Sequence, residues 1–411
     1  MTCERVVIIN DFSLARGGAT ALALLSARLF RDRGLPVTLF CGDDASKSGD
    51  LNGLGINIVP VGGKPLLEQG KLQAMASGLY NTKAKAALEA LIAEQDTPQT
   101  IYHVHAWSLI LSPSIFTALQ PVAPRVIVHS HDQFLACPNG VFYDFQKGVS
   151  CNRTPLGLSC MTTHCDKRSY IHKGWRVARQ ALLGRSFGDQ YPWGAIAIIH
   201  PRMEQRLKTF GYANSTMVTV RNPVSPFTNQ RVKVENNSEF FFVGRMEPDK
   251  GVVELARAAQ AAGVQLVTIG EGPLSAMFAE QFPEVRQEGW CDKPRLQTLL
   301  QTARAVVMPS LFAEPFGMVA IEAQQSGIPV IIPDTAFLAE EIAALGLGIS
   351  CNIHDTDAFA LALTKLKDMP ATQIKQISET AFANATPLAL DEQAWGDALL
   401  DLYTSVLAKA A

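Results

Sequence analysis

The 411-residue sequence has no excess of charge of either sign. It carries 36 basic and 38 acidic residues, a formal net charge of −2. Proteins that coat nucleic acids are far more basic, so we expect no nucleic-acid partner. Apolar residues make up 47% of the chain and charged residues 18%, which excludes a disordered protein. At about 150 residues per domain, this length indicates two or three domains.

The sequence also lacks an apolar run long enough to cross a membrane. The longest uncharged stretch, 97–124, is interrupted by prolines and histidines, whereas a bilayer helix needs about 20 mostly apolar residues. A signal-peptide pattern is absent too, because Glu4 and Arg5 lead directly into the apolar residues Val6–Ile9. We therefore expect a cytoplasmic protein, either free or peripheral at the inner face of the membrane.

Short β-branched runs alternate with helical patterns along the chain. This alternation predicts an α/β fold with parallel sheets covered on both faces, because the runs are continuously apolar. The expected strands are Val6–Ile9, Val37–Phe40, Ile56–Val59, Ile101–Val104, Val126–His129, Ala195–Ile199, Phe240–Val243, Leu266–Ile269, Ala305–Met308 and Val330–Ile332. The clearest helical patterns are Ala19–Arg33, Val252–Ala262 and Asp391–Ala410.

The strand series breaks once, at a proline- and asparagine-rich segment, 221–239, which we interpret as a domain linker. The sequence therefore predicts two Rossmann-like, doubly wound domains facing across a cleft, at 1–221 and 222–390. The last segment, 391–411, is predicted to be a helix that crosses back to the N-terminal domain.

The segment Phe240–Gly251 is the first with recognisable chemistry. A buried strand ends at Gly244, and two cations, Arg245 and Lys250, follow it. Ligands of open α/β sheets lie beyond the carboxyl ends of the strands, and two cations there suit a pyrophosphate. The alternative is a pair of solvated surface cations.

A second segment, 305–324, places two carboxylates on one loop and helix. Glu314 precedes Pro315, which is favoured in the first turn of a helix, and Glu322 lies eight residues after Glu314. Carboxylates accept hydrogen bonds from sugar hydroxyls, and amides at a helix N-terminus bind phosphate. The amides expected there are those of Phe316, Gly317 and Met318. The alternative is a helix-stabilising Glu314 and a surface Glu322.

Three motifs follow one another along the chain: a strand followed by GRxxxxKG, a strand followed by GEGP, and PSxxxEPFGxxxxEA. In this order they resemble retaining glycosyltransferases of the GT-B fold, family four (glycosyl transferases group 1). The resemblance covers nearly the whole chain and implies a nucleotide-sugar donor, UDP- or GDP-linked, with no catalytic metal. It implies that Arg245 and Lys250 bind the diphosphate, that Glu314 contacts the transferred sugar and that Glu322 contacts the ribose. The further donor-site residues that it implies are Gly17, Gly18, Gly244, Gly270, Glu271, Phe316, Gly317 and Met318.

Two strands of the first half end in histidines, IYHVHAW and VIVHSHDQF. Alternate residues of a strand share a face, so His129 and His131 are predicted to point the same way. By resemblance, His131 lies near the reacting sugar, while His105 and Asp132 belong to the acceptor side.

Four of the eight cysteines crowd into an insert, 137–165, with the spacing C-x13-C-x8-C-x4-C. Four thiolates suit a structural zinc ion or an iron–sulfur cluster. Two disulfides, reactive thiols and unliganded cysteines are the alternatives. The insert indicates a subgroup of the family, and its cysteines are Cys137, Cys151, Cys160 and Cys165.

The next stretch, 166–185, interleaves basic and aromatic residues, which suits an anionic membrane surface or a lipid-linked pyrophosphate. A solvated helix face is the alternative. Together these features predict a retaining glycosyltransferase that transfers a sugar to a glycan or lipid-linked acceptor, in bacterial cell-surface polysaccharide synthesis. The rival hypotheses are a non-catalytic GT-B subunit and a nucleotide-sugar epimerase.

Overall fold

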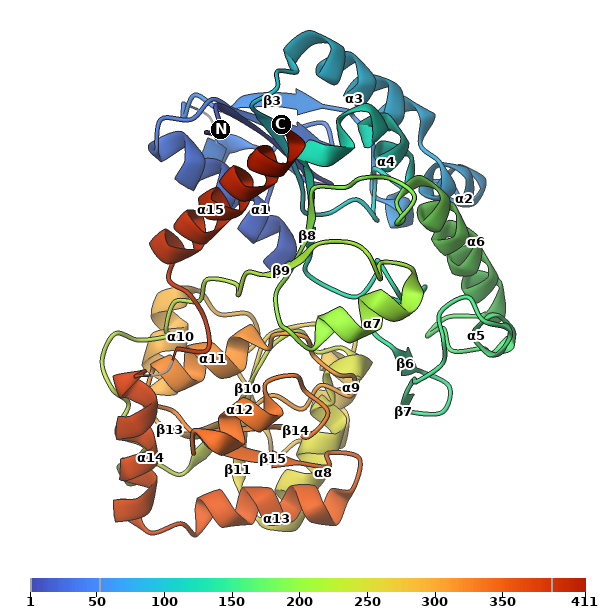
Figure 1. The fold of residues 1–411 in the computed structure, drawn as a ribbon. Coiled ribbons are helices and arrows are strands. Elements are labelled where there is room, and N and C mark those ends of the chain that lie inside the picture. The colour runs from blue at the N-terminus through green and yellow to red at the C-terminus, as the bar shows by residue number, and fades with distance from the viewer. Residues whose placement is uncertain (1, 52, 386) are drawn as a thin grey trace. The chain divides into compact units, whose positions relative to one another are not determined.

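The computed structural model describes residues 2–51, 53–385 and 387–411 (Figure 1). Contacts within the chain divide it into two compact units. Unit 1 comprises the residues up to Lys147, Cys151–Asn222 and Glu392–Ala411, and unit 2 comprises Gly148–Ser150 and Pro223–Asp391.

Unit 1 is built on a seven-stranded parallel sheet in the order β3-β2-β1-β4-β5-β8-β9. Its inner strands are buried because their side chains are apolar on both faces. The strands are β1 (Arg5–Asn10), β2 (Val37–Cys41), β3 (Asn57–Pro60), β4 (Thr100–Val104), β5 (Val126–Ser130), β8 (Ala195–Ile198) and β9 (Met217–Thr219). A separate two-stranded sheet pairs β6 (Tyr143–Asp144) with β7 (Val149–Ser150).

Eight helices accompany the strands of unit 1 in the described chain. They are α1 (Gly18–Asp32), α2 (Lys71–Leu79), α3 (Thr82–Gln95), α4 (Ser114–Leu119), α5 (Leu158–Thr162), α6 (Tyr170–Ser186), α7 (Met203–Phe210) and α15 (Glu392–Ala410). The C-terminal helix α15 lies beside α1 (Figure 1). Its Trp395, Leu399 and Tyr403 are fully buried, and Arg33 forms a 2.7 Å ion pair with Asp397.

Unit 2 is built on a six-stranded parallel sheet in the order β12-β11-β10-β13-β14-β15. Its strands are β10 (Glu239–Val243), β11 (Gln265–Ile269), β12 (Arg286–Gln287), β13 (Ala303–Val307), β14 (Val330–Pro333) and β15 (Gly348–Cys351). Its helices are α8 (Val252–Ala262), α9 (Ser275–Gln281), α10 (Lys293–Leu300), α11 (Met318–Gln325), α12 (Ala339–Ala344), α13 (Thr356–Lys367) and α14 (Ala371–Ala383).

The ten strands expected from the sequence are all present, with ends that shift by at most two residues. Five strands were not expected: β6, β7, β9, β12 and β15. They are short, and β9, β12 and β15 lie at sheet edges, so they carry no long apolar run that a sequence pattern could reveal.

Among the described residues, no helix has the length and apolar content needed to span a bilayer.

Candidate functional site

The predicted donor residues of unit 2 follow three neighbouring strands. Gly244 follows β10, Gly270 follows β11, and the loop with Glu314 follows β13. The three strands are parallel, so these loops meet at one edge of the sheet, the edge where α/β proteins bind ligands. We call it the strand-end edge of unit 2.

Close backbone contacts at this edge require glycine at two positions. A Cβ atom on Gly270 would lie 1.9 Å from the carbonyl oxygen of Gly244, and Gly270 has φ +128°. A Cβ atom on Gly251 would lie 1.8 Å from the carbonyl oxygen of Pro309, and Gly251 has φ +69°. Both positions therefore combine a left-handed backbone with a neighbouring carbonyl that leaves no room for a side chain. The loops are fixed to one another through their backbones.

Lys250 and Glu314 form an ion pair at the strand-end edge. The Lys250 Nζ atom donates to Glu314 Oε2 at 3.1 Å, and the Ser310 hydroxyl donates to the same oxygen at 2.8 Å. The ammonium also lies 5.3 Å from the centre of the Phe312 ring. The contacts hold both charged side chains half-buried and in defined positions, although 64 residues separate them in the sequence.

Arg245 and Glu271 are more open to solvent. The Arg245 side chain is 73% exposed and pairs with Glu247 at 2.8 Å. The Glu271 carboxylate accepts from the backbone amide of Trp290 at 3.3 Å. Since it is exposed, Arg245 can move its guanidinium onto a bound anion at little cost.

The helix that carries Glu322 begins later than expected. We expected Pro315 in its first turn, but α11 begins at Met318, and Gly317 caps it with left-handed backbone angles (φ 64°, ψ 55°). Phe316 therefore precedes the helix, and of the three predicted amides only that of Met318 belongs to its first turn. Glu322 lies one turn further on, and burial raises the pKa of its carboxyl to about 7.

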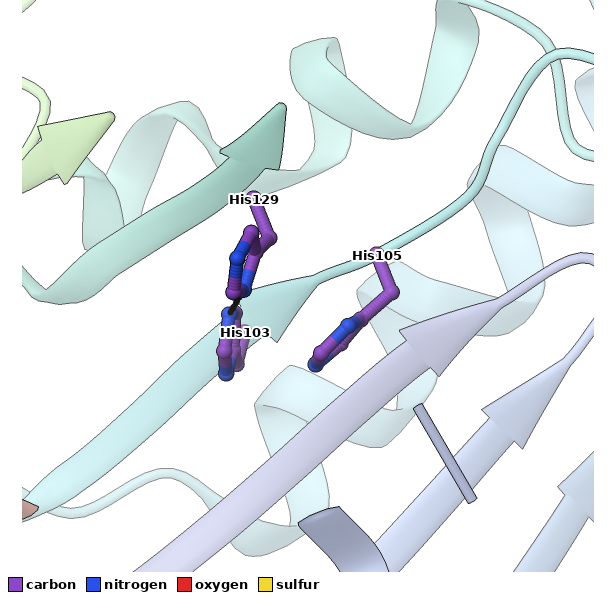
Figure 2. Close-up of side chains that lie close together, drawn as sticks. All are labelled: His103, His105 and His129. Carbon is purple, nitrogen blue, oxygen red and sulfur yellow. Dashed lines mark hydrogen bonds between the residues drawn. The ribbon is translucent and has the colours of Figure 1, made fainter. Parts of the chain in front are cut away.

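In unit 1, four histidines form a stack at the ends of β4 and β5. His103 and His105 have ring centres 4.0 Å apart, and those of His129 and His131 are 4.1 Å apart. This confirms that His129 and His131 share a face of their strand. Figure 2 shows three of these rings, with His103 hydrogen-bonded to His129. His103 also bonds to the Tyr403 hydroxyl on α15 at 2.6 Å.

Burial keeps the histidine stack uncharged. It lowers the pKa of His131 to about 3 and the pKa values of His103, His105 and His129 well below the ordinary range. The ring nitrogens of His103, His105 and His129 lie within 4.8 Å of one another. They are the one group of three possible metal ligands this close together among the described residues. His103 bonds to Tyr403 and His129, and His105 bonds to His131, whereas the buried Nε2 atom of His129 has no hydrogen-bond partner among the described residues.

His105, which we expected on the acceptor side, is buried beneath the ring of His131. His105 is only 4% exposed. Its Nδ1 shares a 2.9 Å hydrogen bond with His131 Nε2, and its Nε2 lies 3.4 Å from the Ser26 hydroxyl. Both nitrogens are therefore engaged, and His105 holds the ring of His131 in place.

Asp132 lies next to His131 and remains exposed to solvent. Surrounding protein atoms nevertheless raise the pKa of its carboxyl to about 6.

The sequence did not single out Asp11, a buried carboxylate after β1 that accepts from the amides of residues 109–111 at 2.9 Å each. Asp11 could have been recognised from its position just after the predicted strand. Its hydrogen bonds fix the loop after β4.

Gly17 and Gly18 lie at the start of α1. Gly17 caps the helix with φ 131°, and a Cβ atom there would meet no neighbour within 4 Å. At position 17, glycine is therefore required by the backbone angle and not by crowding, and this residue leaves the helix start open.

The basic stretch 166–185 does not present its central cations to solvent as we expected for a membrane surface. Lys173 is 1% exposed and Arg179 is 4% exposed. Arg176 pairs with the buried Asp166 at 2.7 Å. Arg179 donates to the Ser108 carbonyl at 3.0 Å, and burial lowers the pKa of its guanidinium to about 10. These three cations are internal structural groups, so they do not form a lipid-binding face.

A family comparison identifies the part of the chain that contains the strand-end edge. Residues 226–383 match the family described as "Glycosyl transferases group 1". This segment is therefore similar to group 1 glycosyl transferases. It includes Arg245, Lys250, Glu314 and Glu322, and it lies within unit 2.

Similarity to curated proteins extends into unit 1. The chain is 27% identical over 266 residues to a protein named "Glycogen synthase" from Mycobacterium tuberculosis. That alignment covers 60% of this chain and 61% of the relative. The chain thus matches about three fifths of this relative's length.

Solved structures establish the fold over the whole chain. Sucrose-phosphate synthase from Thermosynechococcus elongatus matches with a TM-score of 0.72 and 15% identity, over 99% of this chain and 100% of that one. Anabaena HepE in complex with UDP matches with a TM-score of 0.66 and 16% identity, over 98% and 100%. The chain therefore has the α/β fold of the GT-B class, with one Rossmann-like domain in each unit.

Proposed function

We propose that this protein is a retaining glycosyltransferase that moves a sugar from a nucleotide-diphosphate sugar to an acceptor. The observation that carries the proposal is the Lys250–Glu314–Ser310 cluster at the strand-end edge, inside the segment that matches the glycosyltransferase family. The half-buried cation suits the diphosphate of a sugar nucleotide, and the carboxylate held beside it suits the hydroxyls of the attached sugar.

In this proposal the cations perform the electrostatic part of the reaction. Lys250 and Arg245 bind the diphosphate and stabilise the negative charge that it gains as the sugar departs. The Met318 amide at the start of α11 adds a donor to the same group, and Gly244 and Gly270 allow its close approach. Fixed cations supply the charge that a divalent metal would otherwise provide, so we propose no catalytic metal.

Glu314 and Glu322 recognise the two sugar rings of the donor. Glu314 accepts from hydroxyls of the transferred sugar, with Lys250 and Ser310 fixing its orientation. Glu322 accepts from the ribose diol, and its ionised form accepts these hydrogen bonds most strongly. The pKa of about 7 makes this contact sensitive to pH near neutrality.

Unit 1 supplies the acceptor side in this proposal. His131, held by His105, lies beside the exposed carboxylate of Asp132 at the carboxyl end of β5. Gly17 leaves the start of α1, where Gly18 follows, open to a substrate. We assign His131 to the reacting sugar and Asp132 to the acceptor.

The donor class follows from the relatives and the chemistry of the edge. HepE has been solved with UDP and with UDP-glucose. A similar solved protein, WaaG, is described as involved in lipopolysaccharide biosynthesis. We propose a UDP- or GDP-sugar donor and a glycan or lipid-linked acceptor of bacterial cell-surface polysaccharide synthesis, with the protein on the cytoplasmic side of the membrane.

The test is product analysis with a panel of UDP- and GDP-sugars and glycan acceptors. We expect release of the nucleoside diphosphate and a product with the donor's anomeric configuration, read by NMR. Glu314→Ala should abolish transfer with an unchanged circular dichroism spectrum, while Glu280→Ala on the exposed face of α9 should transfer normally. Epimerised donor without any acceptor would identify an epimerase, and donor binding with no transfer to any acceptor would favour a non-catalytic subunit. Full transfer by Glu314→Ala would overturn the assigned role.

A further inference from the structure

The four cysteines of the insert meet around one small cavity. Cys137 lies in the loop after β5, Cys151 follows β7, Cys160 lies on α5, and Cys165 precedes α6. All four line a cavity of about 10 Å³, and three of them are 6–7% exposed. All four are free cysteines. The four thiols of a segment with only short helices and strands therefore line the same small cavity.

Positively charged side chains donate hydrogen bonds to three of these sulfurs. The Lys173 Nζ atom donates to Cys160 Sγ at 3.5 Å and to Cys165 Sγ at 3.3 Å. Arg153 donates to Cys151 Sγ at 3.4 Å, which leaves each of these three sulfurs with a positively charged donor.

Lys173 is the most informative of these donors. It is 1% exposed, and its hydrogen-bond partners among the described residues are the sulfurs of Cys160 and Cys165. A buried ammonium is costly unless negative charge faces it, and neutral thiols provide none. Thiolates that ligate a metal keep excess negative charge and accept hydrogen bonds from such donors.

We propose that Cys137, Cys151, Cys160 and Cys165 bind one zinc ion. Binding releases four thiol protons to solvent and leaves a centre with a charge of −2. Lys173 offsets part of this charge, and Arg153, which also pairs with the buried Asp144 at 3.2 Å, lies beside Cys151. A cavity of about 10 Å³ has room for about one small guest, so it suits a single ion better than a cluster of several iron and sulfide atoms.

The sulfurs move inward when the ion binds. Tetrahedral Zn–S bonds of about 2.3 Å place sulfurs about 3.8 Å apart. Among the described residues, the only group of three or more ligand atoms within 4.8 Å of one another is His103, His105 and His129, so the thiols are not yet that close. Cys151 is half-buried, so the ion enters from its side of the cavity.

The zinc centre fixes the loop that follows His131. The Cys137 amide donates to the Gln133 carbonyl at 2.8 Å, and the Gln133 side chain accepts from Arg206 at 2.8 Å. Asn139 ties the same loop to Tyr143 through a 2.8 Å hydrogen bond to its carbonyl. The ion therefore has a structural role that positions the residues beyond β5, and its presence does not depend on the proposed transferase activity.

Metal analysis of the full chain, purified without oxygen or chelators, tests the proposal. We expect about one equivalent of zinc, lost in Cys160→Ser and retained in the matched control Cys291→Ser, whose thiol lies in unit 2. Iron with acid-labile sulfide would overturn zinc in favour of a cluster. Less than a tenth of an equivalent of any metal, or disulfides between the four cysteines, would overturn the metal site.

A second measurement keeps the test decisive where Cys160→Ser does not fold. The wild-type protein is stripped with a chelator and reloaded with Co²⁺, whose tetrahedral thiolate complexes absorb intensely. We expect that absorption at one equivalent, together with a fall in Tm on stripping that zinc reverses. Stripped protein with an unchanged Tm and no cobalt–thiolate absorption would contradict the proposal.

Discussion

The buried histidine stack should make unit 1 sensitive to acid. The pKa of His131 is about 3 in the folded protein and about 6.5 in an unfolded chain. Between these two values the unfolded state binds a proton that the folded state does not, so stability is full above pH 6.5 and declines as the pH falls toward 3. At 1.36 kcal/mol per pH unit, His131 alone removes about 2 kcal/mol between pH 7.5 and pH 5.

The other three histidines add to this loss, because burial also lowers their pKa values well below the ordinary range. A typical domain has a total stability of about 5–15 kcal/mol. We therefore expect unit 1 to be clearly less stable at pH 5 than at pH 7.5.

Urea unfolding followed by tryptophan fluorescence measures this loss in unit 1, which holds four of the five tryptophans: Trp107, Trp175, Trp193 and Trp395. In His129→Gln one titrating group is removed, so the free energy of unfolding should fall less over the same pH range. His172→Gln, at the exposed start of α6, should leave the decline unchanged. An unfolding free energy equal at pH 7.5 and pH 5 would refute the reasoning, as would an equal decline in His129→Gln.

Four further predictions concern unit 2 and α6. Lys250→Met should weaken binding of UDP or GDP by about 10- to 100-fold in calorimetry, because it removes a charge-assisted contact; unchanged affinity would contradict the role. Donor affinity should fall from pH 8 to pH 6 as Glu322, whose pKa is about 7, takes up its proton, and Glu322→Gln should flatten that profile. Gly251→Ala should lower the free energy of unfolding of unit 2 by about 2 kcal/mol or more, since its Cβ would overlap the Pro309 carbonyl. Gly174→Ala, in open space on α6, should raise the Tm through a gain of about 0.5–1 kcal/mol.

Sequence patterns predicted the buried strands because burial on both faces leaves a continuous apolar run. β10, with its run of phenylalanines, is a clear example. The same reasoning could not find β12, which is only Arg286–Gln287 and polar. The start of α11 was misplaced because Pro315 is a good first-turn residue, while the left-handed Gly317 that actually caps the helix has no distinctive local pattern.

The proposed donor residues were recognisable as motifs, but their contacts were not predictable. The sequence placed Lys250 and Glu314 at strand ends, whereas their ion pair depends on how β10 and β13 lie side by side. Alternation along a strand predicted that His129 and His131 share a face. The bond from His103 to Tyr403 joins residues 300 positions apart and required the placement of α15 in unit 1.

The burial of Lys173 and Arg179 was missed for a related reason. Helical spacing shows that charged residues recur on α6 but not which neighbours cover them. The acceptors that receive these cations, the thiols of Cys160 and Cys165 and the Ser108 carbonyl, come from other segments.

The central claim is that the strand-end edge of unit 2 binds a nucleotide-diphosphate sugar. Titration calorimetry of the full chain with UDP and GDP at pH 8, in parallel with Lys250→Met, tests it most directly. The account predicts saturable binding of at least one nucleotide with one site per chain, and a 10- to 100-fold loss in the variant, about 1.4–3 kcal/mol of binding free energy. Binding of neither nucleotide by the folded protein, or equal binding by the variant, would contradict it.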